Sequence, residues 1–322
     1  VLGILVLVIF ASIFSTNRKN IDWRLVGIGI LLQAIFGILI TKVAFVASIF
    51  TKVSAGFVKF LSFSEQGAQF IFGDLATSSF GFIFAFQVLP TIIFFSTVSA
   101  GLYYLGVLQK VVFVIAWVMA RTMRLSGPES LSAAGNIFLG QTEAPLLVKP
   151  FIPTMSRSEL MCLMTGGMAT IAGGVLAGYV AFLGGDDPVE KTRFATYLLG
   201  ASIMNAPAAI VISKIIIPEE KERKLDEHLD ISGQVPDVNL IDAMSRGASE
   251  GLRLALNVGA MLLAFIAVIA ALNYLLSGII GEFLGLNNFV VKSTNGTFSG
   301  FSLEYLLGQV FRVFAWITFS GI

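Results

Sequence analysis

Long apolar runs, separated by polar connections, dominate the chain and predict helices that cross a membrane. Runs of this kind cover residues 1–14, 25–40, 82–108, 159–183, 195–217 and 254–276. A helix needs about 20 residues to cross the hydrocarbon core, whereas barrel strands would alternate apolar and polar residues over about ten. The pattern therefore predicts an all-α, polytopic membrane protein.

Two further stretches carry basic residues at intervals among apolar ones. They are residues 41–63, with Lys42, Lys52 and Lys59, and residues 110–124, with Lys110, Arg121 and Arg124. Helices with a basic face and an apolar face lie along the membrane surface. The sequence therefore predicts two interfacial helices, whereas the more polar residues 64–80, 218–242 and 277–300 predict loops.

A polar cluster interrupts the apolar pattern between Gly135 and Pro145. It gathers Asn136, Gln141, Thr142 and Glu143. A capping box at Ser126 and Glu129 predicts a helix that reaches Leu139, and a second short helix follows from Pro145 towards Phe151. Both arms are too short to cross a bilayer, which predicts a re-entrant hairpin with a polar tip. The alternative is a polar surface loop between two spans.

A second capping box, at Ser156 and Glu159, opens a span that is rich in small residues. Their density from Thr170 to Gly174 fits a helix that unwinds at mid-depth and offers carbonyls to a ligand. Close helix packing through small residues is the alternative. In the next span, residues 205–207 (Asn-Ala-Pro) predict a bend with a polar group at mid-depth.

Composition agrees with a membrane protein and excludes several other classes. Of 322 residues, 56% are hydrophobic and 13% charged, where soluble domains have about a quarter charged. The net charge of +1 gives no indication of a nucleic-acid polymer as a partner. Cys162 and His228 are the single residues of their types, so neither an internal disulfide nor a zinc site of the usual kind is expected.

The polar cluster and four other segments resemble one family, the concentrative nucleoside transporters of the bacterial, sodium-coupled type. The hairpin segment is residues 136–146 (NIFLGQTEAPL), and the others are residues 81–96, 103–106, 169–179 and 255–261. The resemblance implies a homotrimer in the cell inner (plasma) membrane. A mobile transport domain would carry the site across the bilayer, in an elevator-like motion against a trimerisation scaffold.

The resemblance also implies roles for individual residues. The nucleobase would be contacted by Gln141, Thr142, Glu143 and Val175. The coupling sodium ion would be held by the Asn136 side chain, the Leu139 carbonyl, the Thr170 hydroxyl and the Ile171 carbonyl. Amide, hydroxyl and carbonyl oxygens are the ligands that a hard cation takes, so the chemistry of these positions agrees with the roles.

The resemblance suggests four functional parts. Residues 1–125 would be mostly scaffold, 126–217 part of the transport domain, 218–253 a hydrophilic cytoplasmic loop, and 254–322 a scaffold span with the start of the C-terminal part. The family's second hairpin, with an Asn-Glu-Phe motif, and its Phe-Ala-Asn segment do not occur here. We therefore expect the ribose-contacting residues to lie outside this chain, in a longer protein of which it is the ordered part. The alternative is a fragment that cannot transport by itself.

These observations predict a secondary active transporter that imports nucleosides by sodium symport, and not an enzyme. A proton-coupled nucleoside or nucleobase transporter is the alternative. An intramembrane enzyme using Glu143 as acid or base is more remote, because the sequence places no second carboxylate, histidine or reactive cysteine sensibly at membrane depth. A channel would need a ring of like charges or a repeated filter motif, and neither is visible.

Overall fold

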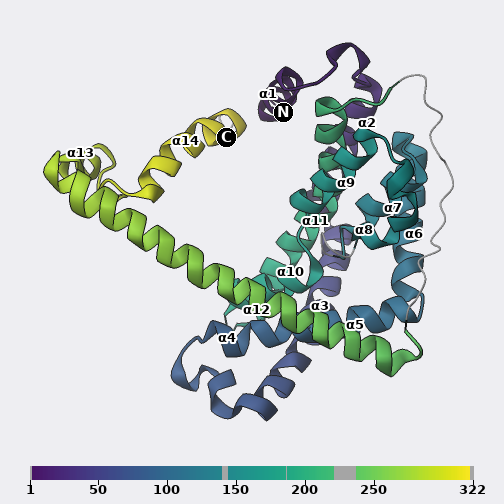
Figure 1. The fold of residues 1–322 in the computed structure, drawn as a ribbon, viewed down its shortest axis with the longest axis horizontal. Helices are drawn as coiled ribbons and strands as arrows, with labels where there is room; N and C mark the ends of the chain where they lie inside the picture. Colours follow the sequence, from purple (N-terminus) through teal and green to yellow (C-terminus); the bar gives the residue numbers. More distant parts are fainter. Residues whose placement is uncertain (1, 140–143, 186, 221–236, 320–322) are drawn as a thin grey trace. The chain divides into compact units, whose positions relative to one another are not determined.

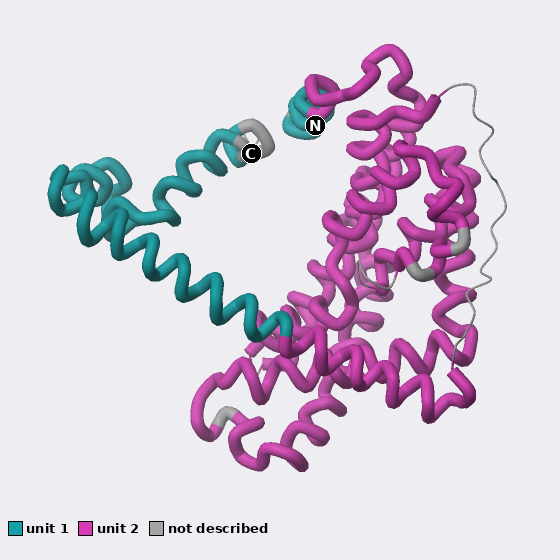
Figure 2. The backbone as a smooth tube through the Cα atoms, in the orientation of Figure 1, with its two compact units in different colours: residues 1–10, 257–322 teal, residues 11–256 magenta. Residues whose placement is uncertain are grey.

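The computed structural model describes residues 2–139, 144–185, 187–220 and 237–319, which are helical with short connections (Figure 1). Contacts divide the chain into two compact units, residues 11–256 and residues 1–10 with 257–322 (Figure 2). The described residues that are predicted to bind sodium or nucleoside belong to the larger unit.

The first part of the chain consists of α1 (Leu2–Ile13), α2 (Trp23–Lys42), α3 (Ala44–Phe72), α4 (Phe84–Gln87), α5 (Leu89–Tyr104) and α6 (Val107–Met123). It is followed by α7 (Gly127–Gly135), α8 (Ala144–Leu147), a 3₁₀ segment (Lys149–Thr154), α9 (Arg157–Ala169), α10 (Gly173–Gly184) and α11 (Pro188–Ile216). The last elements are α12 (Leu240–Asn273), a π-helical stretch (Tyr274–Gly281), α13 (Leu286–Ser293) and α14 (Leu303–Phe319).

Among the described residues, six helical stretches are long and apolar enough to cross a membrane. They are Trp23–Lys42, Ala44–Ala76, Phe84–Tyr104, Arg157–Gly184, Pro188–Ile216 and Leu240–Gly281. The prediction of an all-α, multi-pass membrane protein is confirmed.

Residues 41–72 were predicted as an interfacial helix followed by a loop, and the loop was wrong as far as residue 72. These residues belong largely to α3, a continuous helix of 29 residues that is apolar enough to cross a membrane. Leu61, Ser64 and Ala68 are buried at helical spacing, while the polar residues Glu65 and Gln69 lie on the exposed side. The polar residues that suggested a loop therefore occupy one face of a helix.

One predicted span start and one predicted loop in the C-terminal part also differ from the structure. Helix α12 begins at Leu240, well before the predicted span, because small residues at every fourth position form a buried stripe: Ala243, Gly247, Gly251 and Ala255. The predicted loop at 277–300 contains the end of the π-helical stretch and α13. The side chain of Asn287 stabilises this region, since its Nδ2 donates to the Ser277 carbonyl over 2.9 Å.

Helix α11 is the centre of the larger unit and packs against α2, α3, α9 and α10. A buried apolar cluster joins α3, α10 and α11 and consists of Leu61, Leu176, Ala177, Val180 and Ala195. The helix continues through Pro207, so the bend predicted at residues 205–207 does not end it. One long helix therefore contacts both the hairpin region and the small-residue span.

Candidate functional site

The predicted hairpin has two short helical arms that pack together. The capping box forms as predicted: Ser126 Oγ accepts the Glu129 amide over 3.3 Å, and Glu129 Oε2 accepts the Ser126 amide over 3.2 Å. Helix α7 ends at Gly135, earlier than the predicted Leu139, and has nine residues, or about 14 Å. A Cβ atom on Gly135 would lie 2.7 Å from the Leu147 side chain of α8, so glycine allows this close approach.

The tip of the hairpin is only partly described. Gln141, Thr142 and Glu143, the three predicted nucleobase contacts at the tip, lie outside the described residues. Asn136 and Leu139, predicted as sodium ligands, are buried in the turn after α7. Val175, the fourth predicted nucleobase contact, is half-buried in the first turn of α10.

The small-residue span is broken, as the sequence predicted. Helix α9 ends at Ala169, α10 begins at Gly173, and Thr170 between them has extended backbone (φ −106°, ψ 160°). The Gly173 amide donates to the Phe138 carbonyl over 3.2 Å. A Cβ atom on Gly173 would lie 2.6 Å from that carbonyl oxygen. The structure thus brings the turn after α7 directly against the break, although the two are distant in sequence.

Asn136 is the most unusual polar residue at this junction. Its side chain is 0% exposed, and neither Oδ1 nor Nδ2 has a hydrogen-bond partner within the described ranges. It lies against Gly166 of α9, where an added Cβ would be 3.0 Å from Nδ2. Leaving a buried polar group unpaired costs about 1–3 kcal/mol, so a bound ion or water is the usual explanation.

One predicted sodium ligand on the break, Thr170, bonds to the residue that Asn136 contacts. Thr170 Oγ1 donates to the carbonyl of Gly166, the residue that Asn136 contacts, over 2.8 Å. The adjacent Ile171 carbonyl accepts no hydrogen bond from any described residue. Amide, hydroxyl and carbonyl oxygens, the groups that these predicted ligands offer, suit a hard monovalent cation, which prefers oxygen ligands.

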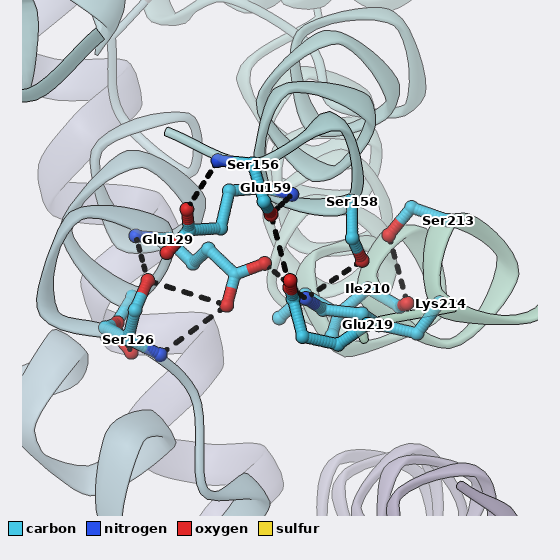
Figure 3. Close-up of polar contacts among 10 residues, drawn as sticks. Ser126, Glu129, Ser156, Ser158, Glu159, Ile210, Ser213, Lys214 and Glu219 are labelled. Carbon is cyan, nitrogen blue, oxygen red and sulfur yellow. Dashed lines mark hydrogen bonds and ion pairs between the residues drawn. The ribbon is translucent and has the colours of Figure 1, made fainter. Parts of the chain in front are cut away.

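A buried polar network ties the base of the hairpin to α9 and α11 (Figure 3). Lys214 in the last turn of α11 forms an ion pair with Glu129 of α7 and a second with Glu219, at 3.1 Å. Its Nζ also donates to Ser158 Oγ over 3.0 Å. The Lys214 side chain is only 7% exposed, so these partners satisfy a charge that burial would otherwise penalise strongly.

Sequence reasoning did not find this network or the role of Ser202, which donates to the Ile137 carbonyl over 3.2 Å. A signal for Lys214 was present, because an ionisable residue inside an apolar run needs a partner. Ser202 carried no such signal, since hydroxyls in membrane helices commonly bond to their own helix backbone. The sequence marked Asn205 as a polar group at mid-depth but did not predict its partner. Asn205 Nδ2 donates to the Ala169 carbonyl over 2.9 Å.

Comparison with known proteins decides the family. Family models match successive parts of the chain: the N-terminus of Na⁺ dependent nucleoside transporters at residues 2–75, nucleoside recognition at 85–186, and the C-terminus of Na⁺ dependent nucleoside transporters at 197–319. An uncharacterized transporter of Haemophilus influenzae is 41% identical over 310 residues, which are 96% of this chain and 72% of that protein. The chain belongs to the concentrative nucleoside transporter family.

Other relatives of this transporter chain agree. The uncharacterized transporter YutK of Bacillus subtilis is 41% identical, over 98% of this chain and 73% of its own length. Sodium/nucleoside cotransporter 1 of mouse is 41% identical over 85% of this chain but 41% of that protein. A solved structure of CNTnw, inward-facing and substrate-bound, has a TM-score of 0.85 and 37% identity, and covers 98% of this chain and 71% of that one.

The family membership also agrees with the apolar helices of the fold. The described part of the chain contains six stretches able to cross a membrane, and the family consists of membrane transporters. The chain is therefore a multi-pass membrane protein. In a bacterial cell such a protein is located in the inner membrane. The hairpin motif that suggested the family lies inside the nucleoside-recognition match at residues 85–186.

Proposed function

We propose that this transporter chain imports nucleosides together with sodium, as a secondary active symporter and not as an enzyme or a channel. The observation that carries the proposal is the fully buried Asn136 amide, with no bonded partner among the described residues, at the junction of hairpin and broken helix. A sodium ion satisfies the Asn136 oxygen. The name of the mouse relative, sodium/nucleoside cotransporter 1, supports the same coupling.

The sodium ligands are the Asn136 side chain, the Leu139 carbonyl, the Thr170 hydroxyl and the Ile171 carbonyl. Two of them come from the turn after α7 and two from the break between α9 and α10. The hydrogen bond from the Gly173 amide to the Phe138 carbonyl supports this assignment, because it holds both segments together. Binding of sodium would strengthen the same junction.

The nucleobase contacts are Gln141, Thr142 and Glu143, with Val175 packing beside the base. A nucleobase edge presents donors and acceptors together, and an amide, a hydroxyl and a carboxylate can bind both kinds. These three residues follow directly after the turn that holds Asn136 and Leu139. Sodium bound at this turn therefore favours the nucleoside-binding conformation. Because the effect of each ligand on the affinity for the other is equal, bound nucleoside also raises the affinity for sodium.

We further propose a homotrimer in which residues 126–217 belong to a mobile transport domain. The buried Lys214 network supports common movement, because it connects α7, α9 and α11 at one end. Structures of CNTnw described as outward-facing, intermediate and inward-facing match this chain with TM-scores of 0.84 to 0.85. Rigid-body movement of one domain against another is a common mechanism of alternating access.

Uptake of uridine into proteoliposomes tests the proposal. We expect uptake to follow an inward sodium gradient and to stop when choline replaces sodium. Uptake that follows a proton gradient and ignores sodium would contradict sodium coupling and favour the proton-coupled alternative. Equal competition by free uracil would contradict the nucleoside specificity and indicate a nucleobase transporter.

A further inference from the structure

Two side chains of α11 reach the two interrupted segments of the site. Ser202, which is fully buried, donates its hydroxyl to the Ile137 carbonyl over 3.2 Å. Asn205 donates its Nδ2 to the Ala169 carbonyl over 2.9 Å. Residues three apart lie on one face of a helix, so a single face of α11 contacts both the hairpin turn and the end of α9.

Both carbonyls need a partner because they lie where a helix stops. The last four carbonyls of a helix have no partner within it, and Ala169 is the final residue of α9. Ile137 lies just after the end of α7, in the turn. Side chains of α11 therefore replace the backbone bonds that the two interruptions remove.

The spacing connects these bonds to the proposed cation ligands. Ile137 lies two residues before Leu139, and Ala169 lies two residues before Ile171. In both segments, a carbonyl proposed to bind sodium therefore comes two residues after a carbonyl that α11 binds. Since α11 is a continuous helix, it fixes the two backbone segments relative to one common element.

We infer that Ser202 and Asn205 are positioning residues of the sodium site. They act through Ile137 and Ala169 and do not bind the ion themselves. By holding both carbonyl segments in place before the ion arrives, they lower the cost of assembling the site and raise sodium affinity. The inference rests on the proposed sodium coupling.

A purely structural role makes a different prediction. If the two bonds only cap interrupted helices, their loss lowers the stability of the protein but leaves the sodium concentration at half-saturation unchanged. A positioning role raises that concentration. The decisive measurement is therefore sodium binding in the absence of nucleoside.

The experiment uses the purified transporter and the variants Ser202→Ala and Asn205→Ala. The thermal unfolding midpoint is measured against sodium chloride, with choline chloride keeping the ionic strength constant. Binding of sodium to the folded state raises the midpoint, so the titration reports affinity without transport. We expect the half-saturating sodium concentration to rise about 10-fold in each variant, as for other residues that orient metal ligands.

Ser213→Ala is the matched control on the same helix. Ser213 is also fully buried, but its hydroxyl donates to the Ile210 carbonyl within α11. It also lies within hydrogen-bonding reach of Cys162 in the middle of α9, and neither partner belongs to the hairpin turn or to the end of α9. This variant should keep the wild-type sodium titration. Ser202→Thr keeps the hydroxyl and should restore the wild-type half-saturation, while Asn205→Leu keeps the volume, removes the donor and should match Asn205→Ala.

Uptake by the same variants gives a second readout. At saturating sodium we expect the nucleoside KM and the maximal rate to return towards wild type, because the nucleobase contacts are intact. An unchanged sodium titration in folded Ser202→Ala and Asn205→Leu proteins would overturn the positioning role. A wild-type protein whose unfolding midpoint and uptake both ignore sodium would instead overturn the proposed function.

Discussion

Lys214 near the end of α11 forms a buried ion pair with Glu129 in the first turn of α7 (Figure 3). The Glu129 side chain is 0% exposed and that of Lys214 is 7% exposed. The pair joins the base of the hairpin to the helix that also contacts the turn and the broken span. Helix α11 therefore contacts the base of the hairpin, the turn after α7 and the end of α9 through its own polar side chains.

Removing Lys214 should destabilise the transporter strongly. In Lys214→Met the Glu129 and Glu219 carboxylates lose their cation, and an uncompensated buried charge costs about 3–5 kcal/mol. We expect a large fall in the unfolding midpoint, measured by tryptophan fluorescence of the purified protein. The double variant Lys214→Met with Glu129→Gln should recover much of the lost unfolding midpoint, because it no longer buries the unpaired Glu129 charge.

Lys191→Met is the control for the Lys214 variant. Lys191 pairs with Glu65 at 2.9 Å, but the Glu65 side chain is 49% exposed. An exposed ion pair contributes about 0–1 kcal/mol, so the midpoint should change little. Equal destabilisation by the two lysine variants would contradict the importance of the buried network.

Asn136→Ala should reduce sodium binding with little loss of stability in sodium-free buffer. Its amide has no partner among the described residues, so removing it recovers a desolvation cost of about 1–3 kcal/mol that offsets the cavity. We expect the sodium-induced rise of the unfolding midpoint to disappear, while nucleoside selectivity changes less.

Gln87→Ala provides the contrast to Asn136→Ala. The Gln87 amide donates to the Thr77 and Gly81 carbonyls over 2.9 and 3.1 Å, so its removal leaves two acceptors without their donor. We expect lower stability and an unchanged sodium titration. A sodium response retained in Asn136→Ala would show that the ion binds elsewhere.

Glu143→Gln should abolish nucleoside uptake. The amide keeps the size of the side chain but loses the charge, and a hydrogen bond to a charged group contributes about 1.5–3 kcal/mol. We expect uptake at least about 10-fold below wild type, measured with radiolabelled uridine in proteoliposomes. Sodium-dependent thermal stabilisation should persist, since the proposed ion ligands are unchanged. Normal uptake would remove Glu143 from the binding site.

Gly173→Ala should disturb the junction that Gly174→Ala leaves intact. A Cβ on Gly173 would lie 2.4 Å from ring carbons of Phe95 and 2.6 Å from the Phe138 carbonyl oxygen. A Cβ on Gly174 would meet its nearest atom, on Ile92, at 3.5 Å, which is ordinary contact. We expect the first variant to lose both uptake and sodium response, and the second to resemble wild type. Similar behaviour of the two variants would contradict the close approach.

The sequence predicted those features that depend on local pattern. Apolar length predicted the spanning helices, and the spacing of Ser126 with Glu129 and of Ser156 with Glu159 predicted two helix starts that the structure confirms. The small residues near Gly173 predicted the break. Residues 64–72 were predicted wrongly, because polar residues on one face of a helix resemble a loop when only composition is considered.

Features that depend on residues close together in the sequence could be predicted from it, whereas contacts between distant segments could not. The sequence by itself determined the membrane class, the capped helix starts, the interrupted span and the motif that indicates the family. Only the tertiary structure decided that Ser202 meets Ile137, that Lys214 meets Glu129, and that Asn136 is buried without a bonded partner among the described residues. Helix starts depend on residues three or four apart, whereas these contacts depend on how α11 packs against segments far away in the chain.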